Sequence, residues 1–326
     1  MATALRMMDR FDEGEQLLRR TLETVRDQLS NEHPTTLLGM NRLALFLQKA
    51  EKAQKYAEAE PLLREALEIR LRTQGDHNPA TAHAMHNLAM QLRWQGDLAD
   101  AEPLFDQAIE LYRQIGGEEH ADTLYAQNHY AGLLADLERP AEAEEVCRQV
   151  LEVRQRVLGD DNPATLLSMS HLATLYHKQG RNEDAEPLFR QVLESDRRRH
   201  GEEHSNTIGS LVNLASALRD MGKLEPAEAL CRKALETAKR VLPAGDRMIA
   251  KCQSGYGACL TKLERFPEAQ EHLLGAYERL KETIGEGEQR TLEHLVALYE
   301  AWGKSDQAAQ WRAKLPDEAN SNEQDD

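Results

Sequence analysis

"QGDLADAEPLF" spans Gln95 to Phe105, and "QGRNEDAEPLF" spans Gln179 to Phe189. The two strings lie 84 residues apart and differ at only three positions. A match of this length within one chain indicates an internal repeat, and periods of roughly 20 to 50 residues are typical of proteins built from stacked copies of a small unit. The separation of the two strings equals two periods of such a repeat.

A period of 42 residues runs through most of the chain. The alanine inside each string is followed after four residues by Phe, Leu or Cys, and after seven by Ala or Val. A second apolar column comes thirteen residues before this alanine. Such spacing places the large side chains on one face of a helix, so each repeat predicts two helices, helix A and helix B, joined by a turn. The alanines are Ala59, Ala101, Ala143, Ala185, Ala227 and Ala269, and the second column holds Leu88, Tyr130, Leu172, Leu214 and Tyr256.

Helix A has a recurring start signal. In "HNPAT" and "DNPAT", Asn78 and Asn162 suit the N-cap, and the proline that follows each suits the first helical position. We predict that the histidines at the same point of other repeats, His33, His120 and His204, also act as caps. Prolines near the start of helix B forfeit little hydrogen bonding, so we assign them a structural role. They are Pro61, Pro103 and Pro187.

The composition of the chain bears on its partners and its cellular location. The formal net charge of −16 makes nucleic acid and anionic membranes unlikely partners. The chain has no apolar run long enough for a membrane helix or a signal peptide, and its four cysteines form no C-x-x-C pair, so we expect a cytoplasmic protein. Cys147 and Cys231 fall in the Phe105 column, and we expect them, Cys252 and Cys259 to be buried thiols.

Both ends of the chain depart from the repeat. Aligning Asp9 with Gly96 places Met1 in the middle of a helix A, so the first unit is truncated. Either the chain is a fragment of a longer protein, or its first helix is a stub. The acidic segment Pro316–Asp326 lacks aliphatic anchors, and we predict a disordered tail after a repeat domain over residues 1–315. Three extra residues are expected in the turn within "QKAEKAQKYAEAE".

These columns resemble the tetratricopeptide repeat, whose pattern has the character L-G-x2-Y followed by A-x3-F. The longer period, with "HNPAT", "HNLA" and "QGDLADAEPLFDQAIEL", resembles the kinesin-light-chain-like branch of that family over about Met1 to Leu315. The resemblance implies an all-α, right-handed α-solenoid of about eight helix-turn-helix repeats, with helix A lining a concave groove. The segment "LYEAWGKSDQAAQWRAKLP" is also similar to the closing repeat of tetratricopeptide tails on bacterial signalling proteins, including serine/threonine kinases.

The resemblance also implies a binding site. In the resembled family, asparagines just before an "L-A" pair on helix A contact the backbone of an extended peptide. Here only Asn87 and Asn213 keep that residue, Gly255 breaks the row, and any single member could instead belong to a solvated helix face. Trp94 either anchors a ligand side chain or covers a neighbouring helix. The predicted groove residues are Asn41, Arg42, Asn87, Trp94, His129, His171, Lys178, Asn213 and Asp220.

We therefore predict a non-enzymatic adaptor that binds a peptide or protein segment in the groove, without a cofactor. The alternative is the regulatory or substrate-recruiting tail of a larger bacterial signalling protein, such as a serine/threonine kinase, whose catalytic domain lies outside this chain. No P-loop, G-x-S-x-G or H-E-x-x-H motif is present, and histidine pairs such as His83 with His86 do not complete a metal site. Groove histidines would make affinity change between about pH 5.5 and 7.5. The partner's identity and the oligomeric state are left open.

Overall fold

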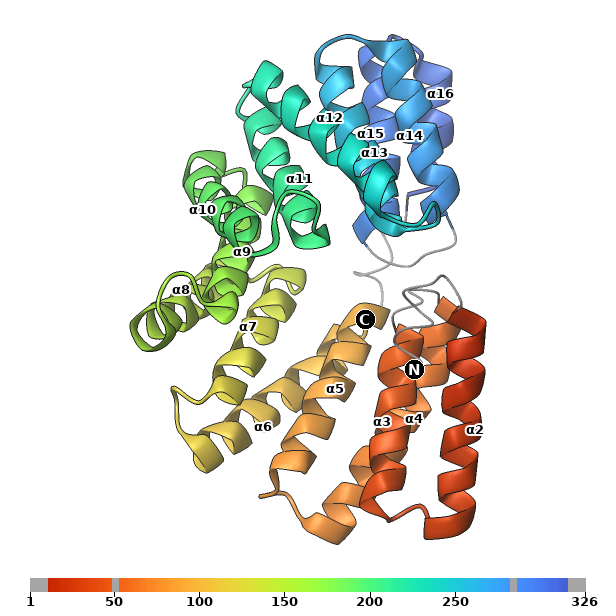
Figure 1. Ribbon diagram of the computed structural model, residues 1–326, viewed down its shortest axis with the longest axis vertical. Helices are drawn as coiled ribbons and strands as arrows, with labels where there is room; N and C mark the ends of the chain where they lie inside the picture. The colour runs from red at the N-terminus through yellow and green to blue at the C-terminus, as the bar shows by residue number, and fades with distance from the viewer. Residues whose placement is uncertain (1–10, 49–52, 282–285, 316–326) are drawn as a thin grey trace, which may run out of the picture. The chain divides into compact units, whose positions relative to one another are not determined.

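The computed structural model describes residues 11–48, 53–281 and 286–315, which form fifteen α-helices (Figure 1). The predicted all-α fold of sequential helix pairs is confirmed. The predictions for residues 1–10 and for the tail at 316–326 lie outside the described residues, as do residues 49–52 of the segment in which three extra residues were expected. Helices A are α3 (Pro34–Gln48), α5 (Pro79–Gln95), α7 (Ala121–Asp136), α9 (Pro163–Lys178), α11 (Ser205–Asp220), α13 (Arg247–Lys262) and α15 (Glu286–Ala301). Helices B are α2 (Phe11–Leu29), α4 (Ala53–Gln74), α6 (Leu98–Gly116), α8 (Pro140–Leu158), α10 (Asn182–His200), α12 (Leu224–Val241), α14 (Phe266–Leu280) and α16 (Ser305–Arg312).

The helices group into two compact units, which meet in sequence between Leu188 and Phe189, inside α10. Unit 1 holds α2 to α9, and unit 2 holds α11 to α16. Within each unit every helix packs against the helices before and after it in the chain. Successive helices A also touch one another, as α5 and α7 or α13 and α15 do.

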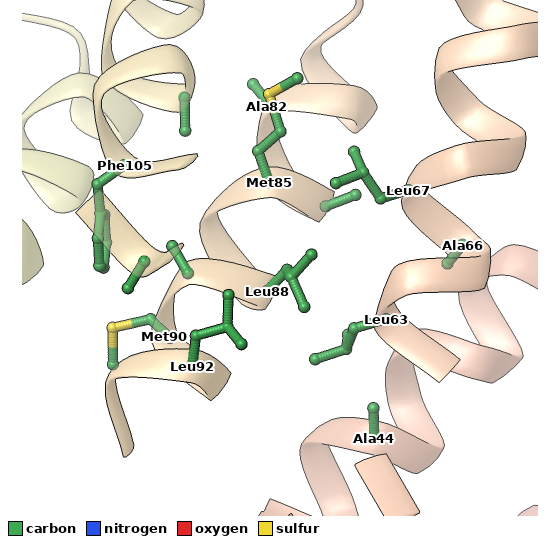
Figure 2. Close-up of a cluster of buried hydrophobic side chains, with 14 of the residues drawn as sticks. Ala44, Leu63, Ala66, Leu67, Ala82, Met85, Leu88, Met90, Leu92 and Phe105 are labelled. Atoms are coloured by element: carbon green, nitrogen blue, oxygen red, sulfur yellow. The ribbon is translucent and has the colours of Figure 1, made fainter. Parts of the chain in front are cut away.

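The repeat columns form the core. Ala59, Ala101 and Ala143 are fully buried, and so is Phe105. Figure 2 shows Leu88 of α5 in the space between its own helix and α4. Because a helix of this length buries only one stripe, each pair depends on its neighbours to exclude water from the rest. All four cysteines are buried free thiols, as predicted.

The predicted N-caps are also confirmed. The Asn78 side chain accepts from the Ala80 amide at 2.8 Å, and Asn162 accepts from the Ala164 amide at 2.9 Å. In three other repeats a histidine Nδ1 accepts from the backbone amide two residues later, at N–N distances of 3.2 to 3.3 Å. The capping histidines are His33, His120 and His204.

A buried threonine fastens the turn from helix B to the next helix A. Thr81 Oγ1 donates to the Gly75 carbonyl at 2.8 Å, and Thr123 donates in the same way to Gly117. Each glycine has a positive φ, which turns its carbonyl toward the start of the next helix. Sequence reasoning treated this threonine only as part of the helix-start string. Thr207 donates in the same way to Gly201, and Thr36 donates to the carbonyl of Ser30, which also has a positive φ.

We expect Thr81→Val to lower the free energy of unfolding by about 1–2 kcal/mol, because the Gly75 carbonyl loses its donor while the side-chain volume is kept. Thr73→Val is the matched control, since Thr73 is exposed and bonds only to a carbonyl of its own helix. Urea unfolding followed by circular dichroism measures both. Equal stability of the two variants would show that the threonine bond contributes nothing.

Candidate functional site

The predicted binding column lies where consecutive helices A meet. In unit 1, Asn87 Nδ2 on α5 donates to Asn41 Oδ1 on α3 at 3.0 Å. Two helices further on, Asn128 Nδ2 on α7 donates to His171 Nδ1 on α9 at 2.5 Å. In unit 1 the predicted binding column consists of Arg42, Asn87, His129 and His171. Each of the two bonds joins the residue directly before a column position on one helix A to the column residue on the next helix A.

The middle contact of this series is made by two imidazoles. The rings of His86 on α5 and His129 on α7 lie 5.3 Å apart between centroids, with one edge toward the other's face. The exposed ring of Tyr125 packs against both histidines. We call the series of three contacts the polar ladder. Its members are Asn41 with Asn87, His86 with His129, and Asn128 with His171.

Unit 2 repeats the pattern with other residues. Ser254 Oγ on α13 lies 3.0 Å from His294 Nδ1 on α15. At Gly255, where the sequence row breaks, an added Cβ would lie 3.6 Å from Val212 Cγ1 on α11. The column residues therefore hold adjacent repeats together, which sequence spacing alone did not indicate. Their contact with a peptide stays a prediction.

The remaining predicted residues lie in different surroundings. Arg42 on α3 and Lys178 at the end of α9 are exposed. Trp94 is 40% exposed, and its ring centroid lies 6.1 Å from that of Tyr56 on α4, so it partly covers the neighbouring helix. Asn213 and Asp220 belong to unit 2. Asp220 ends α11 and accepts from Arg219 Nε at 2.7 Å, whereas the other seven predicted residues belong to unit 1.

Burial keeps the ladder histidines neutral. Loss of hydration lowers the pKa of His86 to about 4 and that of His171 to about 4. Burial, the neighbouring imidazoles and the charges of Arg93 and Arg154 lower the pKa of His129 to about 3. These values lie below the window in which we expected groove histidines to change affinity. Desolvation outweighs the ordinary basicity of imidazole at these positions, and the pH dependence of binding itself stays a prediction.

An apolar column runs beside the ladder, one helical turn nearer the start of each helix A. Leu38 on α3, Tyr125 on α7 and Leu167 on α9 are 44%, 45% and 41% exposed, and His83 is the exposed member on α5. Sequence reasoning missed this column. The repeat spacing carries the signal, because these residues precede the column of Arg42, Asn87, His129 and His171 by four positions each time.

Arginines of helix B reach the same region. Arg154 on α8 is 3% exposed, and its Nη1 donates to the Ala164 carbonyl at 2.9 Å and to Ser168 Oγ at 2.7 Å. Arg70, at the equivalent position of α4, lines a cavity of 330 Å³ with Leu38. Burial lowers the pKa of both guanidinium groups. Neither forms a salt bridge within the described ranges, although Asp122 lines the same cavity as Arg70.

We expect the stability of unit 1 to fall as the pH drops from about 6.5 toward 5. The folded-state pKa of His129 lies below its unfolded value, so the unfolded chain binds more protons in this window. His129→Asn should reduce the loss in unfolding free energy between pH 7 and pH 5 by about 1–2 kcal/mol.

Denaturant unfolding at the two pH values measures this difference. The exposed His77 provides the control, and His77→Asn should lose as much stability as the wild type. An unchanged pH dependence in His129→Asn would contradict the neutral, buried state of the ladder.

No group of three or more His, Cys, Asp or Glu side chains in residues 11–48, 53–281 and 286–315 is arranged to hold a metal ion. Within the same ranges, none of the helices combines the length and apolar character that crossing a membrane requires.

Comparisons with known proteins support the repeat assignment. The sequence model of the tetratricopeptide repeat matches residues 39–90, 122–198, 170–240 and 206–282, and a second model of this repeat matches residues 81–122. No curated protein matches the chain.

Solved structures share the fold at low identity. TPR-like repeats of a Podosopora anserina protein described as a kinesin light chain are 23% identical, with a TM-score of 0.53, over 62% of this chain and 96% of theirs. BtubC (BKLC) from P. vanneervenii is 21% identical, with a TM-score of 0.53, over 72% of this chain and 91% of its own. The apo quorum sensor NprR from B. thuringiensis is 16% identical, with a TM-score of 0.67, over 96% of this chain and 83% of its own.

The family matches extend over well over half of the sequence and follow the helix pairs in order. The structural neighbours include kinesin-light-chain-like proteins. The chain belongs to the tetratricopeptide repeat family.

Proposed function

We propose that this protein is a non-enzymatic, cytoplasmic adaptor that binds an extended segment of a partner protein on the A face of unit 1. The A face is the surface of α3, α5, α7 and α9 that carries the apolar column and the polar ladder. The apolar column is the observation that carries the proposal. Scattered exposed apolar residues are ordinary, but exposed large residues at one equivalent position of several repeats suit a ligand that crosses those repeats.

The ladder supplies polar groups beside the apolar column. The buried Asn128 Oδ1 and His86 Nδ1 have no hydrogen-bond partner among the described residues. An extended peptide offers an N–H and a C=O at every residue, so its backbone suits a row of amide and imidazole groups. In this proposal, apolar side chains of the ligand pack on Tyr125 and Leu167 while its backbone follows the ladder.

The charge of Arg154 further restricts which ligand residues would be favoured. Arg154 is a buried cation whose hydrogen bonds within the described part of the chain go to neutral oxygens, and a carboxylate from the ligand would offset its charge. The chain as a whole carries a formal net charge of −16, so long-range attraction does not favour an acidic partner. Preference for an acidic residue would therefore arise locally, at Arg154, next to an apolar residue held by Tyr125.

The family supports a binding role, because tetratricopeptide repeats generally mediate protein interactions. Structures of similar fold include the apo form of RapI, at 16% identity and a TM-score of 0.56, and the Cut9–Hcn1 hetero-tetramer of the APC/C, at 14% identity and a TM-score of 0.59. The alternative role as a tail of a larger signalling protein stays a prediction, since no contact among the described residues favours it.

The first test is selection of binding peptides from a displayed random library with the full chain, followed by fluorescence anisotropy with a selected peptide. We expect Tyr125→Ala with Leu167→Ala to weaken binding at least about tenfold, because both remove exposed apolar anchors. Ile115→Ala with Val157→Ala is the matched control, since these residues are similarly exposed on helices B. Equal affinity of the two double variants would refute binding on the A face.

A second comparison tests the wider set of predicted groove residues. The triple variant Asn87→Ala, His171→Ala and Asn213→Ala removes groups from both units, and its helicity is checked by circular dichroism. Loss of binding only in this variant would place the ligand along the ladder positions and not on the apolar column.

Arg154 has its own test. In a selected peptide that contains a glutamate, Glu→Gln should weaken binding to the wild type at least about tenfold, because a buried guanidinium loses its counter-ion. Binding to Arg154→Met should be insensitive to the same exchange, and the double-mutant cycle isolates the coupling. Selected peptides without acidic residues, or a cycle with no coupling, would contradict the assignment of Arg154.

A further inference from the structure

Two thiols meet between successive repeats of unit 2. Cys231 Sγ on α12 lies 3.4 Å from Cys259 Sγ on α13. Both side chains are almost completely buried, at 2% and 1% exposure. The helices that carry them pack directly against each other. Sequence reasoning assigned each cysteine separately to the core and did not pair them.

Comparison with the other repeats shows that helix packing does not require two cysteines at these positions. Cys231 and Cys259 are 28 residues apart, and the same two positions in other repeats hold unlike residues. Where Cys147 takes the first position, Leu175 takes the second. Phe105 is matched in the same way with Leu133. Buried side chains other than thiols therefore fill these positions in other repeats.

A cation lies close to the two sulfurs. Arg219 on α11 is ion-paired with Asp220 through Nε and Nη2, at 2.7 and 3.0 Å, while its buried Nη1 has no hydrogen-bond partner in the parts of the chain that the structure describes. The hydrogen bond from the Cys231 thiol and the charge of Arg219 lower the pKa of Cys259. Burial and the adjacent sulfur raise the pKa of Cys231. Cys259 is thus the better thiolate nucleophile of the pair.

We propose that Cys231 and Cys259 are a redox modification site, which a peroxide converts to an intramolecular disulfide joining α12 to α13. The Cys259 thiolate attacks a peroxide oxygen, forms a sulfenic acid and, for hydrogen peroxide, releases hydroxide that is protonated to water. The Cys231 sulfur then attacks the sulfenic sulfur, and a second water leaves with the Cys231 proton. The two thiols lose two electrons and two protons, and the peroxide is reduced to two waters.

The geometry suits this product. A disulfide needs a sulfur–sulfur distance of about 2.05 Å, and the thiols are already in contact across packed helices. The bond would join two successive repeats, which otherwise depend on side-chain packing to stay together. It would restrict the unfolded chain and so stabilise unit 2. This inference is independent of the proposed peptide binding, which uses unit 1.

The test treats the folded full chain with hydrogen peroxide, alkylates the remaining thiols and maps the peptides by mass spectrometry. We expect the free thiols to fall from four to two, with one new peptide linking Cys231 to Cys259, and dithiothreitol to restore all four. Cys252→Ser is the matched control, because Cys252 is buried on the same helix, and this variant should still form the linkage. Arg219→Met should form it more slowly.

Four thiols that persist in the folded wild type, or a linkage that involves Cys252 or a second copy of the chain, would overturn the proposal. A Cys231→Ser variant that still loses Cys259 to a disulfide would do the same. The decisive readout uses the wild-type chain, so a failure of any variant to fold leaves the test intact.

Discussion

The close approach of neighbouring helices through small residues is the constraint on which the rest of this structure depends. Ala101, Ala143 and Ala227 are fully buried, so the backbone of each helix B comes near the helices around it. A large side chain at these positions would push the pairs apart. Because the pairs are close, a single asparagine spans from one helix A to the next, as Asn87 does to Asn41, and two thiols touch between α12 and α13.

The same close packing decides the charge state of the polar groups. Histidines that would titrate near neutrality in water are kept neutral in the ladder, because burial penalises the charged imidazole. Arg154 stays charged, since a guanidinium does not lose its proton at accessible pH, and it bonds to two neutral oxygens. An acidic chain thereby contains a local cationic site, which net charge alone does not reveal.

Comparison of the repeats distinguishes the interactions that recur throughout the scaffold from those that belong to a single repeat. The threonine bond to the turn carbonyl recurs as Thr81 to Gly75 and Thr207 to Gly201, so it belongs to the scaffold. The residues of the polar ladder and the cysteine pair change from one repeat to the next. Positions that vary while the backbone stays the same are where a repeat protein acquires its own chemistry.

The sequence by itself determined the helices, their order and most of the core, because apolar spacing and capping residues are local properties of the chain. Asn78 was recognisable as a cap from its neighbours alone. Only the tertiary structure decided that Asn87 bonds to Asn41, that Arg154 bonds to the neutral oxygens of Ala164 and Ser168, and that Cys231 contacts Cys259. These contacts join residues far apart in sequence, and their geometry depends on how closely the helices pack, which residue spacing does not specify.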